Sequence, residues 1–243
     1  MKRVKTEIKG FDRLIEGGFP DGSITLVSGT PGTGKSIFCM QFLVDCAKRG
    51  ERSLYISFEE TETALRETAK RFSWPVEKLE KEGKLKLVYA KLREDDKAID
   101  KILQIIREGK YQRLVIDSLS DISVYPLFIN NKELPWAQIQ QSINPIALET
   151  DYANRMKIQE VIDKIRETGV TALVTSELSR DSQWYSRDTV SEFACDAVII
   201  LHAVEGEEGF RTLWIPKMRK TKQRAGVYSF EIEKNGINVK SEE

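Results

Sequence analysis

The chain has 243 residues, in which 38 Lys and Arg balance 38 Asp and Glu, with one His and three Cys. This length suits one globular domain, and a net charge of zero provides no global field to attract nucleic acid or anionic lipid. No run approaches the roughly 18 unbroken apolar residues that a membrane span needs, and three cysteines cannot all pair. With no basic-then-apolar leader at the start, these features predict a cytoplasmic protein without membrane insertion and argue against secreted or disulfide-built classes.

Short apolar runs alternate with amphipathic segments, which favours an α/β fold with a mostly parallel central sheet flanked by helices. After residue 197, short strands joined by turns, with Asn235-Gly236 as a hairpin signal, predict a C-terminal antiparallel hairpin extension. We therefore expect one domain over residues 1–243. In chain order we predict strand 24–28, helix 35–48, strand 54–58, helix 62–72, strand 85–90, helix 96–107, strand 114–117, helix 156–167, and strands 170–175, 197–201, 211–218, 228–231 and 237–239.

Residues 121–153 do not fit this alternation. Pro126, Pro135 and Pro145 interrupt the segment, and it has no clean apolar period. More than thirty residues without obvious regular structure are uncommon inside a compact domain. Two interpretations stay open, namely a partly helical insertion and a mobile lid or partner-binding loop.

Residues 29–36 read Gly-Thr-Pro-Gly-Thr-Gly-Lys-Ser, which is the full phosphate-loop pattern between a predicted strand and a predicted helix. Its glycines let the backbone wrap a phosphate and direct N–H groups inward, and the positive end of the helix adds to this attraction. Lys35 would neutralise the β- and γ-phosphates, and the Ser36 hydroxyl would ligate Mg²⁺. The motif therefore predicts a nucleoside triphosphate site built from Gly29, Thr30, Pro31, Gly32, Thr33, Gly34, Lys35 and Ser36.

Three other predicted strands end in polar residues that could meet this loop, because strand ends at one edge of a parallel sheet converge. Asp117 closes an apolar strand and could hold Mg²⁺ through a bound water. Glu59 and Glu60 either orient and deprotonate the attacking water or cap the next helix. Thr175-Ser176-Glu177 either senses the γ-phosphate, with Ser176 as a nucleotide-binding residue, or simply ends its strand.

At these positions the chain resembles the KaiC-like branch of the RecA-type ATPases. The resemblance covers nearly the whole chain except residues 121–153, where this sequence is longer than the family pattern. It is carried by Gly10-Phe11-Asp12, residues 17–22, the phosphate loop, Phe58-Glu59-Glu60-Thr61, Val115-Ile116-Asp117-Ser118, Thr175-Ser176-Glu177, Glu192-Phe193, residues 196–199, Lys217-Met218-Arg219 and Gly236-Ile237.

The resemblance implies a RecA-like P-loop NTPase core in which a sensor strand lies between the phosphate-loop strand and the Asp117 strand. It implies ATP and Mg²⁺ as cofactors, bound between the subunits of a homo-oligomeric ring, usually a hexamer. Glu59 and Glu60 are implied as the catalytic carboxylate pair, and Lys217 and Arg219 as fingers that reach the neighbouring subunit's γ-phosphate. We expect the ATPase cycle to drive a conformational or signalling change in an unidentified protein partner.

The region 211–224 carries six basic residues and no acid. In an extended strand Lys217 and Arg219 share one face, which suits charge neutralisation in phosphoryl transfer. A solvated basic hairpin is the alternative interpretation, and nucleic-acid contact by Lys220, Lys222 and Arg224 is another. Two functions therefore stay open beside the ATPase: a nucleotide-gated scaffold with little turnover, and a recombinase-like DNA-binding accessory protein.

Some proteins of this family phosphorylate themselves on the segment that matches residues 178–190. Hydroxyl groups are abundant in ordinary loops, so composition alone favours a plain surface loop over an autokinase substrate. The hydroxyl-bearing residues of this segment are Ser179, Ser182, Tyr185, Ser186 and Thr189.

Overall fold

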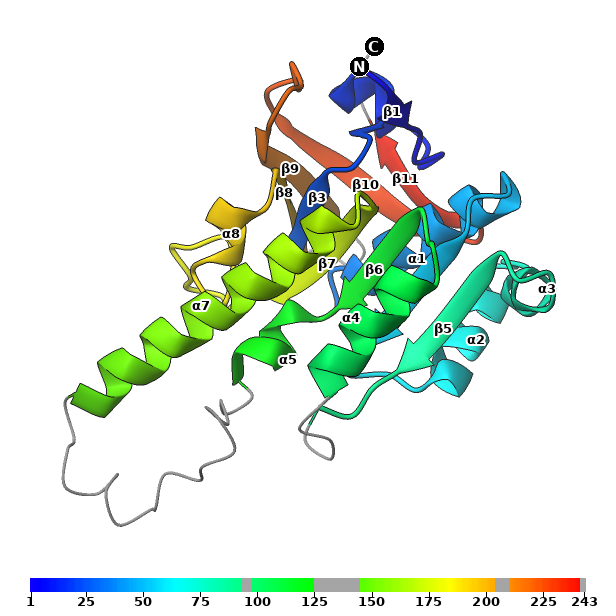
Figure 1. Ribbon diagram of the computed structural model, residues 1–243. Coiled ribbons are helices and arrows are strands. Elements are labelled where there is room, and N and C mark those ends of the chain that lie inside the picture. The colour runs from blue at the N-terminus through cyan, green and yellow to red at the C-terminus, as the bar shows by residue number, and fades with distance from the viewer. Residues whose placement is uncertain (93–97, 125–144, 204–209, 241–243) are drawn as a thin grey trace.

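The apolar runs form one large sheet in the computed structural model, which describes residues 1–92, 98–124, 145–203 and 210–240 (Figure 1). Within these residues the sheet has nine strands in the order β11-β10-β9-β8-β3-β7-β6-β4-β5, and a two-stranded β1–β2 pair stands apart. The strands are β1 (Arg3–Val4), β2 (Phe19–Pro20), β3 (Ile24–Gly29), β4 (Ser53–Ser57), β5 (Leu85–Tyr89), β6 (Arg113–Asp117), β7 (Thr171–Glu177), β8 (Ala197–Ala203), β9 (Arg211–Met218), β10 (Val227–Glu233) and β11 (Gly236–Lys240).

The sheet is parallel from β8 to β5 and antiparallel from β8 through β9 and β10 to β11. β7 lies between β3 and β6, which separates the strand before the phosphate loop from the strand that ends in Asp117. This order and the C-terminal antiparallel hairpin confirm the predicted α/β, RecA-like fold class. Because these strands are parallel, the C-terminal ends of β3, β4, β6 and β7 lie at the same edge of the sheet.

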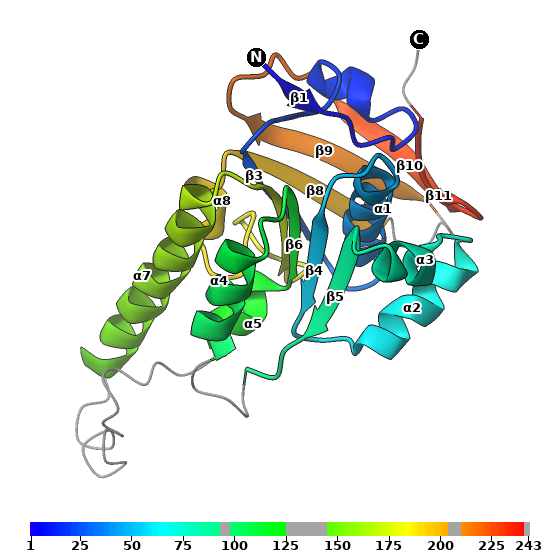
Figure 2. The same cartoon turned by 45° about the vertical axis from the view of Figure 1, so that its right-hand side comes forward.

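Helices cover both faces of the sheet (Figure 2). The first face packs α1 (Lys35–Lys48), α2 (Glu62–Arg71) and α3 (Val76–Lys81) on one buried apolar cluster. The second face packs α4 (Ala98–Glu108), α5 (Leu119–Val124), α7 (Pro145–Glu167) and α8 (Ser191–Ala194) on another. A short 3-10 helix, η1 (Asp12–Ile15), precedes β2. No helix in the described part of the chain is both long and apolar enough to cross a bilayer.

The α7 helix shows how sequence pattern and observed boundary differ. Ile158, Val161, Ile162 and Ile165 recur at helical spacing, and all four are buried, so the predicted helix 156–167 exists. The helix nevertheless begins at Pro145, because proline suits a first helical position, where its missing N–H is not needed. Residues 145–153 of the expected insertion are thus helical, 121–124 belong to α5, and 125–144 lie outside the described residues.

Candidate nucleotide-binding site

The phosphate loop is a tight turn between β3 and α1 whose shape depends on glycine. Gly32 and Gly34 have φ angles of +80° and +101°, in the region that side chains other than glycine rarely adopt. A Cβ on Gly29 would lie 2.3 Å from the carbonyl oxygen of Leu201 on the neighbouring strand. The absence of a side chain at Gly29 therefore lets the end of β3, where the loop begins, pack closely against β8.

Lys35 begins α1 and folds back over the loop. Lys35 is only 9% exposed, and its Nζ donates hydrogen bonds to the carbonyl oxygens of Gly29 at 3.0 Å and Thr30 at 3.2 Å. A bound phosphate would offer the ammonium group charged oxygens in place of these neutral ones, and hydrogen bonds between charged groups are stronger. The loop thus holds its cation close to where a phosphate group would lie.

Asp117 ends β6 and is nearly buried. Its two carboxylate oxygens accept hydrogen bonds from two buried hydroxyls, Oδ2 from Tyr55 at 2.5 Å and Oδ1 from Thr175 at 2.5 Å. Burial and the charge of Asp117 raise the pKa of Tyr55 well above its usual range, so the phenol keeps the proton that it donates. These contacts fix the orientation of the carboxylate.

Ser36 and Asp117 supply oxygen donors that suit Mg²⁺. Ser36 lies in the first turn of α1, and α1 packs against β6, the strand that ends in Asp117. The described residues contain no group of three or more His, Cys, Asp or Glu side chains that could hold a metal ion. One hydroxyl and one carboxylate nevertheless fit an ion that takes its other ligands from water and nucleotide phosphates.

Glu59 and Glu60 follow β4 at the same edge. Their backbone N–H groups both donate to the Ser57 hydroxyl, at 3.3 and 2.8 Å, while Thr61 supplies the side-chain cap of α2. Partial burial, together with the charges of Asp117 and other nearby carboxylates, raises the pKa of Glu59 to about 7. Burial and Asp117 also raise the pKa of Glu60. Thr61 thus caps α2, and the catalytic role of Glu59 and Glu60 stays a prediction.

The two hydroxyls of the Thr175-Ser176 pair point to opposite faces of the sheet, as neighbouring strand residues do. Thr175 reaches Asp117 on the α1 face, whereas the Ser176 hydroxyl lies 3.2 Å from that of Ser120 and accepts the Arg187 N–H at 3.0 Å. The structure therefore brings Thr175, rather than Ser176, to the Asp117 carboxylate. The assignment of Ser176 to the nucleotide remains a prediction.

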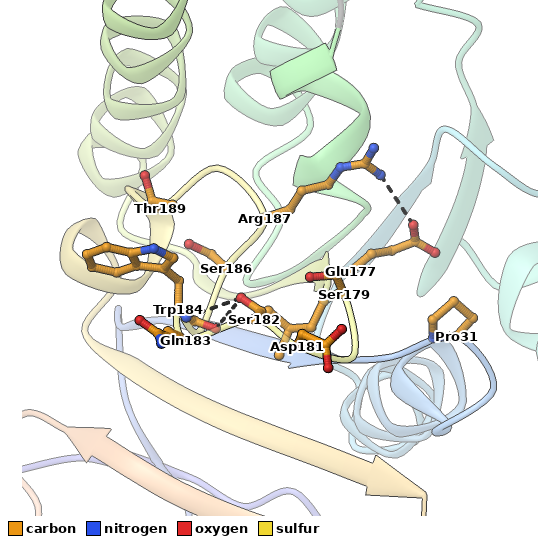
Figure 3. Close-up of a pocket in the computed structure, with 11 residues that line it drawn as sticks. Pro31, Glu177, Ser179, Asp181, Ser182, Gln183, Trp184, Ser186, Arg187 and Thr189 are labelled. Carbon is orange, nitrogen blue, oxygen red and sulfur yellow. Dashed lines mark hydrogen bonds and ion pairs between the residues drawn. The ribbon is translucent and has the colours of Figure 1, made fainter.

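A pocket of about 730 Å³ opens beside the phosphate loop, between Pro31 and the segment that follows β7 (Figure 3). Glu177 and Arg187 form an ion pair across it, with Oε2 and Nη1 3.6 Å apart. Residues 178–190, whose hydroxyl groups we expect to belong to a plain surface loop, thus border the phosphate loop. The remaining lining residues are Leu178, Ser179, Asp181, Ser182, Gln183, Trp184, Ser186 and Thr189.

Lys217 and Arg219 lie at the other edge of the sheet. Lys217 Nζ donates to the carbonyl oxygens of Glu192, Phe193 and Cys195, at 2.9, 3.1 and 2.7 Å, at the end of α8. Burial, and secondarily the charge of Arg219, lower the pKa of Lys217. Both basic side chains therefore contact the connection between α8 and β8, on one face of the sheet, and neither contacts the phosphate loop of its own chain.

Arg219 pairs with Asp196, with Nη1 3.5 Å from Oδ1, and its side chain is 55% exposed. The strand register measures how far this edge is from the loop. Lys217 pairs with Val198 on β8, and Val198 pairs with Leu26 on β3. Leu26 lies three residues before Gly29, so Lys217 is displaced from the loop by about 10 Å along the strand direction. Arg219 lies further still from the loop, next to Asp196.

Comparison with known proteins agrees with this geometry. The sequence profile of the family described as ATPase: KaiC matches residues 4–128 and 138–243. The chain is 32% identical to circadian clock protein KaiC3 of Synechocystis, covering 98% of this chain and 46% of that protein. It is 31% identical to circadian clock oscillator protein KaiC of Synechococcus elongatus, covering 98% and 44%. The chain belongs to the KaiC family of ATPases.

The fold of this KaiC-family chain also matches a solved structure. A KaiC-like protein from the hyperthermophilic archaeon Pyrococcus horikoshii superimposes with a TM-score of 0.78 and is 34% identical, with 99% of each chain covered. The chain spans about half the length of the curated relatives it matches, so it corresponds to a single KaiC-type domain. Membership of the family supports nucleotide binding and ATPase activity at a general level.

Three further basic residues of the region 211–224, Lys220, Lys222 and Arg224, are exposed. Their backbone is attached to the N-terminal segment, since Arg3 donates to the Lys220 carbonyl oxygen at 3.1 Å and the Lys222 N–H donates to Glu16 at 3.3 Å. Nucleic-acid contact by these three side chains stays a prediction.

Tyr55 is the residue of the KaiC-type site that sequence analysis missed. It lies in an apolar strand and resembles ordinary core. The available signal is its hydroxyl, because a buried tyrosine usually needs a hydrogen-bond partner. Finding the partner requires the strand order, which the local pattern does not contain.

Proposed function

We propose that this KaiC-family protein binds and hydrolyses ATP with Mg²⁺ at junctions between copies of its own chain. The observation that carries the proposal is the separation of two half-sites. The phosphate loop, Asp117 and Glu59 lie at one edge of the sheet, and the two basic residues Lys217 and Arg219 lie at the opposite edge. A single copy cannot bring these groups together, whereas a neighbouring copy can offer its basic edge to the phosphate loop.

On the near side of the nucleotide, Lys35 pairs with the β- and γ-phosphates and the loop N–H groups surround them. Ser36 and Asp117 would hold Mg²⁺, and the bound ion would neutralise charge on the phosphate oxygens. The preformed loop and the fixed Asp117 carboxylate support this assignment, because neither needs a large rearrangement to meet a triphosphate.

Glu59 is the general base in this proposal. A base is most effective when its pKa is close to the working pH, and Glu59 has a pKa of about 7 beside Asp117. It orients the attacking water and takes one proton from it as the water oxygen bonds to the γ-phosphorus and the bond to the ADP oxygen breaks. Glu60, whose pKa is also raised, is the second carboxylate of the pair.

Lys217 and Arg219 act on the far side, from the neighbouring copy. Two cations next to the γ-phosphate stabilise the negative charge that spreads over its oxygens in the transition state. An interface that joins one edge of a copy to the opposite edge of the next is heterologous and can close into a ring. We propose a hexamer, the ring size that the family resemblance implies. We infer that the ATP cycle of this ring drives a conformational or signalling change in a protein partner.

Mixing two inactive variants tests this arrangement. Glu59→Gln removes the base, and Arg219→Ala removes the neighbour's finger, so each variant alone should bind ATP without turnover. In rings formed from an equal mixture, about one interface in four combines an intact Glu59 with an intact Arg219, so about a quarter of the wild-type rate should return. Phosphate release is measured before and after the subunits are mixed.

The control is Lys220→Ala, which removes a neighbouring exposed cation and should leave turnover unchanged. If light scattering shows that the variants assemble and the mixture still releases no phosphate, the result contradicts the shared site. Wild-type rings that form with ATP but release no phosphate point instead to a nucleotide-gated scaffold. Binding of an oligonucleotide that weakens steeply with salt and needs Lys222 and Arg224 would favour the DNA-binding accessory function.

A further inference from the structure

Tyr55 combines a core position with a polar contact at the proposed metal site. The residue is fully buried among apolar side chains on the α1 face of the sheet. Phenylalanine would fill the same space without a polar atom, whereas a buried hydroxyl without a partner costs about 1–3 kcal/mol. The Tyr55 hydroxyl meets that requirement through one acceptor, Oδ2 of Asp117 at 2.5 Å.

Strand register explains why the hydroxyl reaches this atom. β4 and β6 are parallel neighbours in which Tyr55 pairs with Val115 and Ser57 pairs with Asp117. Tyr55 therefore lies two residues before the level of Asp117, about 6.6 Å along the strands and on the same face. A phenol ring leaning along the strand spans this distance, and a shorter side chain would not.

The geometry accounts for both oxygens of Asp117. Thr175, level with Asp117 on the other neighbouring strand, donates to Oδ1 at 2.5 Å, while Tyr55 donates to Oδ2. An ionised carboxylate accepts at about four positions, so two buried donors leave one lone pair on each oxygen for other partners. The carboxylate is held from both neighbouring strands, and its rotation would break both hydrogen bonds.

We propose that Tyr55 is a positioning residue that orients the Asp117 carboxylate for water-mediated Mg²⁺ binding beside the phosphates of ATP. The inference rests on the proposed function, because it assumes that Asp117 serves Mg²⁺. It assigns Tyr55 a role that acts through Asp117 and does not involve contact with the nucleotide. Groups that orient a metal-binding residue in this way typically affect metal affinity about 10- to 100-fold.

A double-mutant cycle on ATP binding tests the role without relying on turnover. Affinity for a fluorescent ATP analogue is measured with Mg²⁺ and with EDTA for wild type, Tyr55→Phe, Asp117→Asn and the double variant. The ratio of the two affinities is the gain that Mg²⁺ provides. Tyr55→Phe should reduce this gain about tenfold and leave the EDTA affinity within about twofold of wild type. In the Asp117→Asn background, Tyr55→Phe should change nothing further.

Two other variants separate positioning from general loss of structure. Thr25→Val removes a buried hydroxyl on the same face of the sheet that has no hydrogen-bond partner among the described residues, and should preserve the full Mg²⁺ gain. Thr175→Val removes the second hydroxyl on Asp117 and should reduce the gain as Tyr55→Phe does. It also tests the same geometry where Tyr55→Phe fails to fold, as judged by thermal denaturation.

Three outcomes would overturn the inference. The first is a Mg²⁺ gain in Tyr55→Phe equal to that of wild type, which would make Tyr55 a core residue only. The second is an equal loss of affinity with Mg²⁺ and with EDTA, which would indicate a general effect on the loop. The third is a wild-type protein that binds ATP with no Mg²⁺ gain, which would remove the Mg²⁺ assignment of the proposed function as well.

Discussion

Lys35 keeps a charge almost buried by hydrogen bonding to two carbonyl oxygens of its own loop. Lys35→Ala should weaken ATP binding at least about tenfold, because it removes hydrogen bonds between charged groups at the phosphates. The measurement is equilibrium binding of a fluorescent ATP analogue. Lys48→Ala, at the other end of α1 where the ammonium pairs with Asp45 on the surface, is the matched control and should bind like wild type. Equal affinities for the two variants would contradict the assignment.

The pKa of Glu59 predicts the pH dependence of turnover. The base must be ionised, so the rate of phosphate release should rise with pH through about 7 and then level off. Glu59→Gln should lower the rate at least about 100-fold and retain ATP binding. Steady-state rates across this pH range check both points. A wild-type rate that is flat from about pH 6 to 8 would exclude Glu59 as the titrating base.

The same raised pKa affects stability with a definite sign. Glu59 titrates near 7 in the folded chain and near its ordinary value of 4.5 in the unfolded chain, so the folded state holds the proton more tightly. Its contribution to stability is complete below pH 4.5 and disappears as the pH rises through about 7. In thermal denaturation, the melting temperature of Glu59→Gln should therefore rise relative to that of wild type as the pH increases between those two values. Parallel curves for the two proteins would contradict the shift.

Among the elements, the connection from β3 to α1 depends most on close backbone packing. Gly29→Ala would place a Cβ 2.3 Å from the Leu201 carbonyl oxygen and 2.8 Å from Thr33 Oγ1, so we expect a loss of about 2 kcal/mol in the free energy of unfolding. Gly32→Ala meets nothing within 4 Å, and only its positive φ angle opposes the change, so its loss should be smaller. Urea denaturation of both variants gives the comparison, and equal losses would argue against the contact with β8.

Sequence pattern predicted the elements whose signals are local. The phosphate loop, the strands 24–28 and 114–117 and the α7 stripe each carry their own periodicity or motif, and the structure contains them. The start of α7 at Pro145 was missed because its first residues lack a clear apolar period. The hydrogen bonds of Tyr55 and Thr175 to Asp117 were missed because they depend on which strands are neighbours and at what register.

For the whole molecule, a shared site makes activity depend on assembly. Phosphate release per chain should rise with protein concentration and then level off as rings form, because dilution removes Lys217 and Arg219 from the neighbour's nucleotide. Light scattering on the same samples relates rate to mass. Arg219→Ala should still assemble but stay inactive at every concentration. A monomer that hydrolyses ATP at a constant rate per chain would contradict the shared site.

The segment that leaves β7 would connect neighbouring sites in such an assembly. It starts at Glu177, beside the chain's own phosphate loop, passes Arg187, and ends at the carbonyl oxygens of α8 that hold Lys217. In the proposed assembly this stretch of backbone would connect the nucleotide site of one subunit to the basic residue that the same subunit offers to the next. Nucleotide bound at one junction would thus be coupled, through residues 177–195, to the contact made at the next junction, and this coupling would act in both directions because linkage between two binding sites is reciprocal.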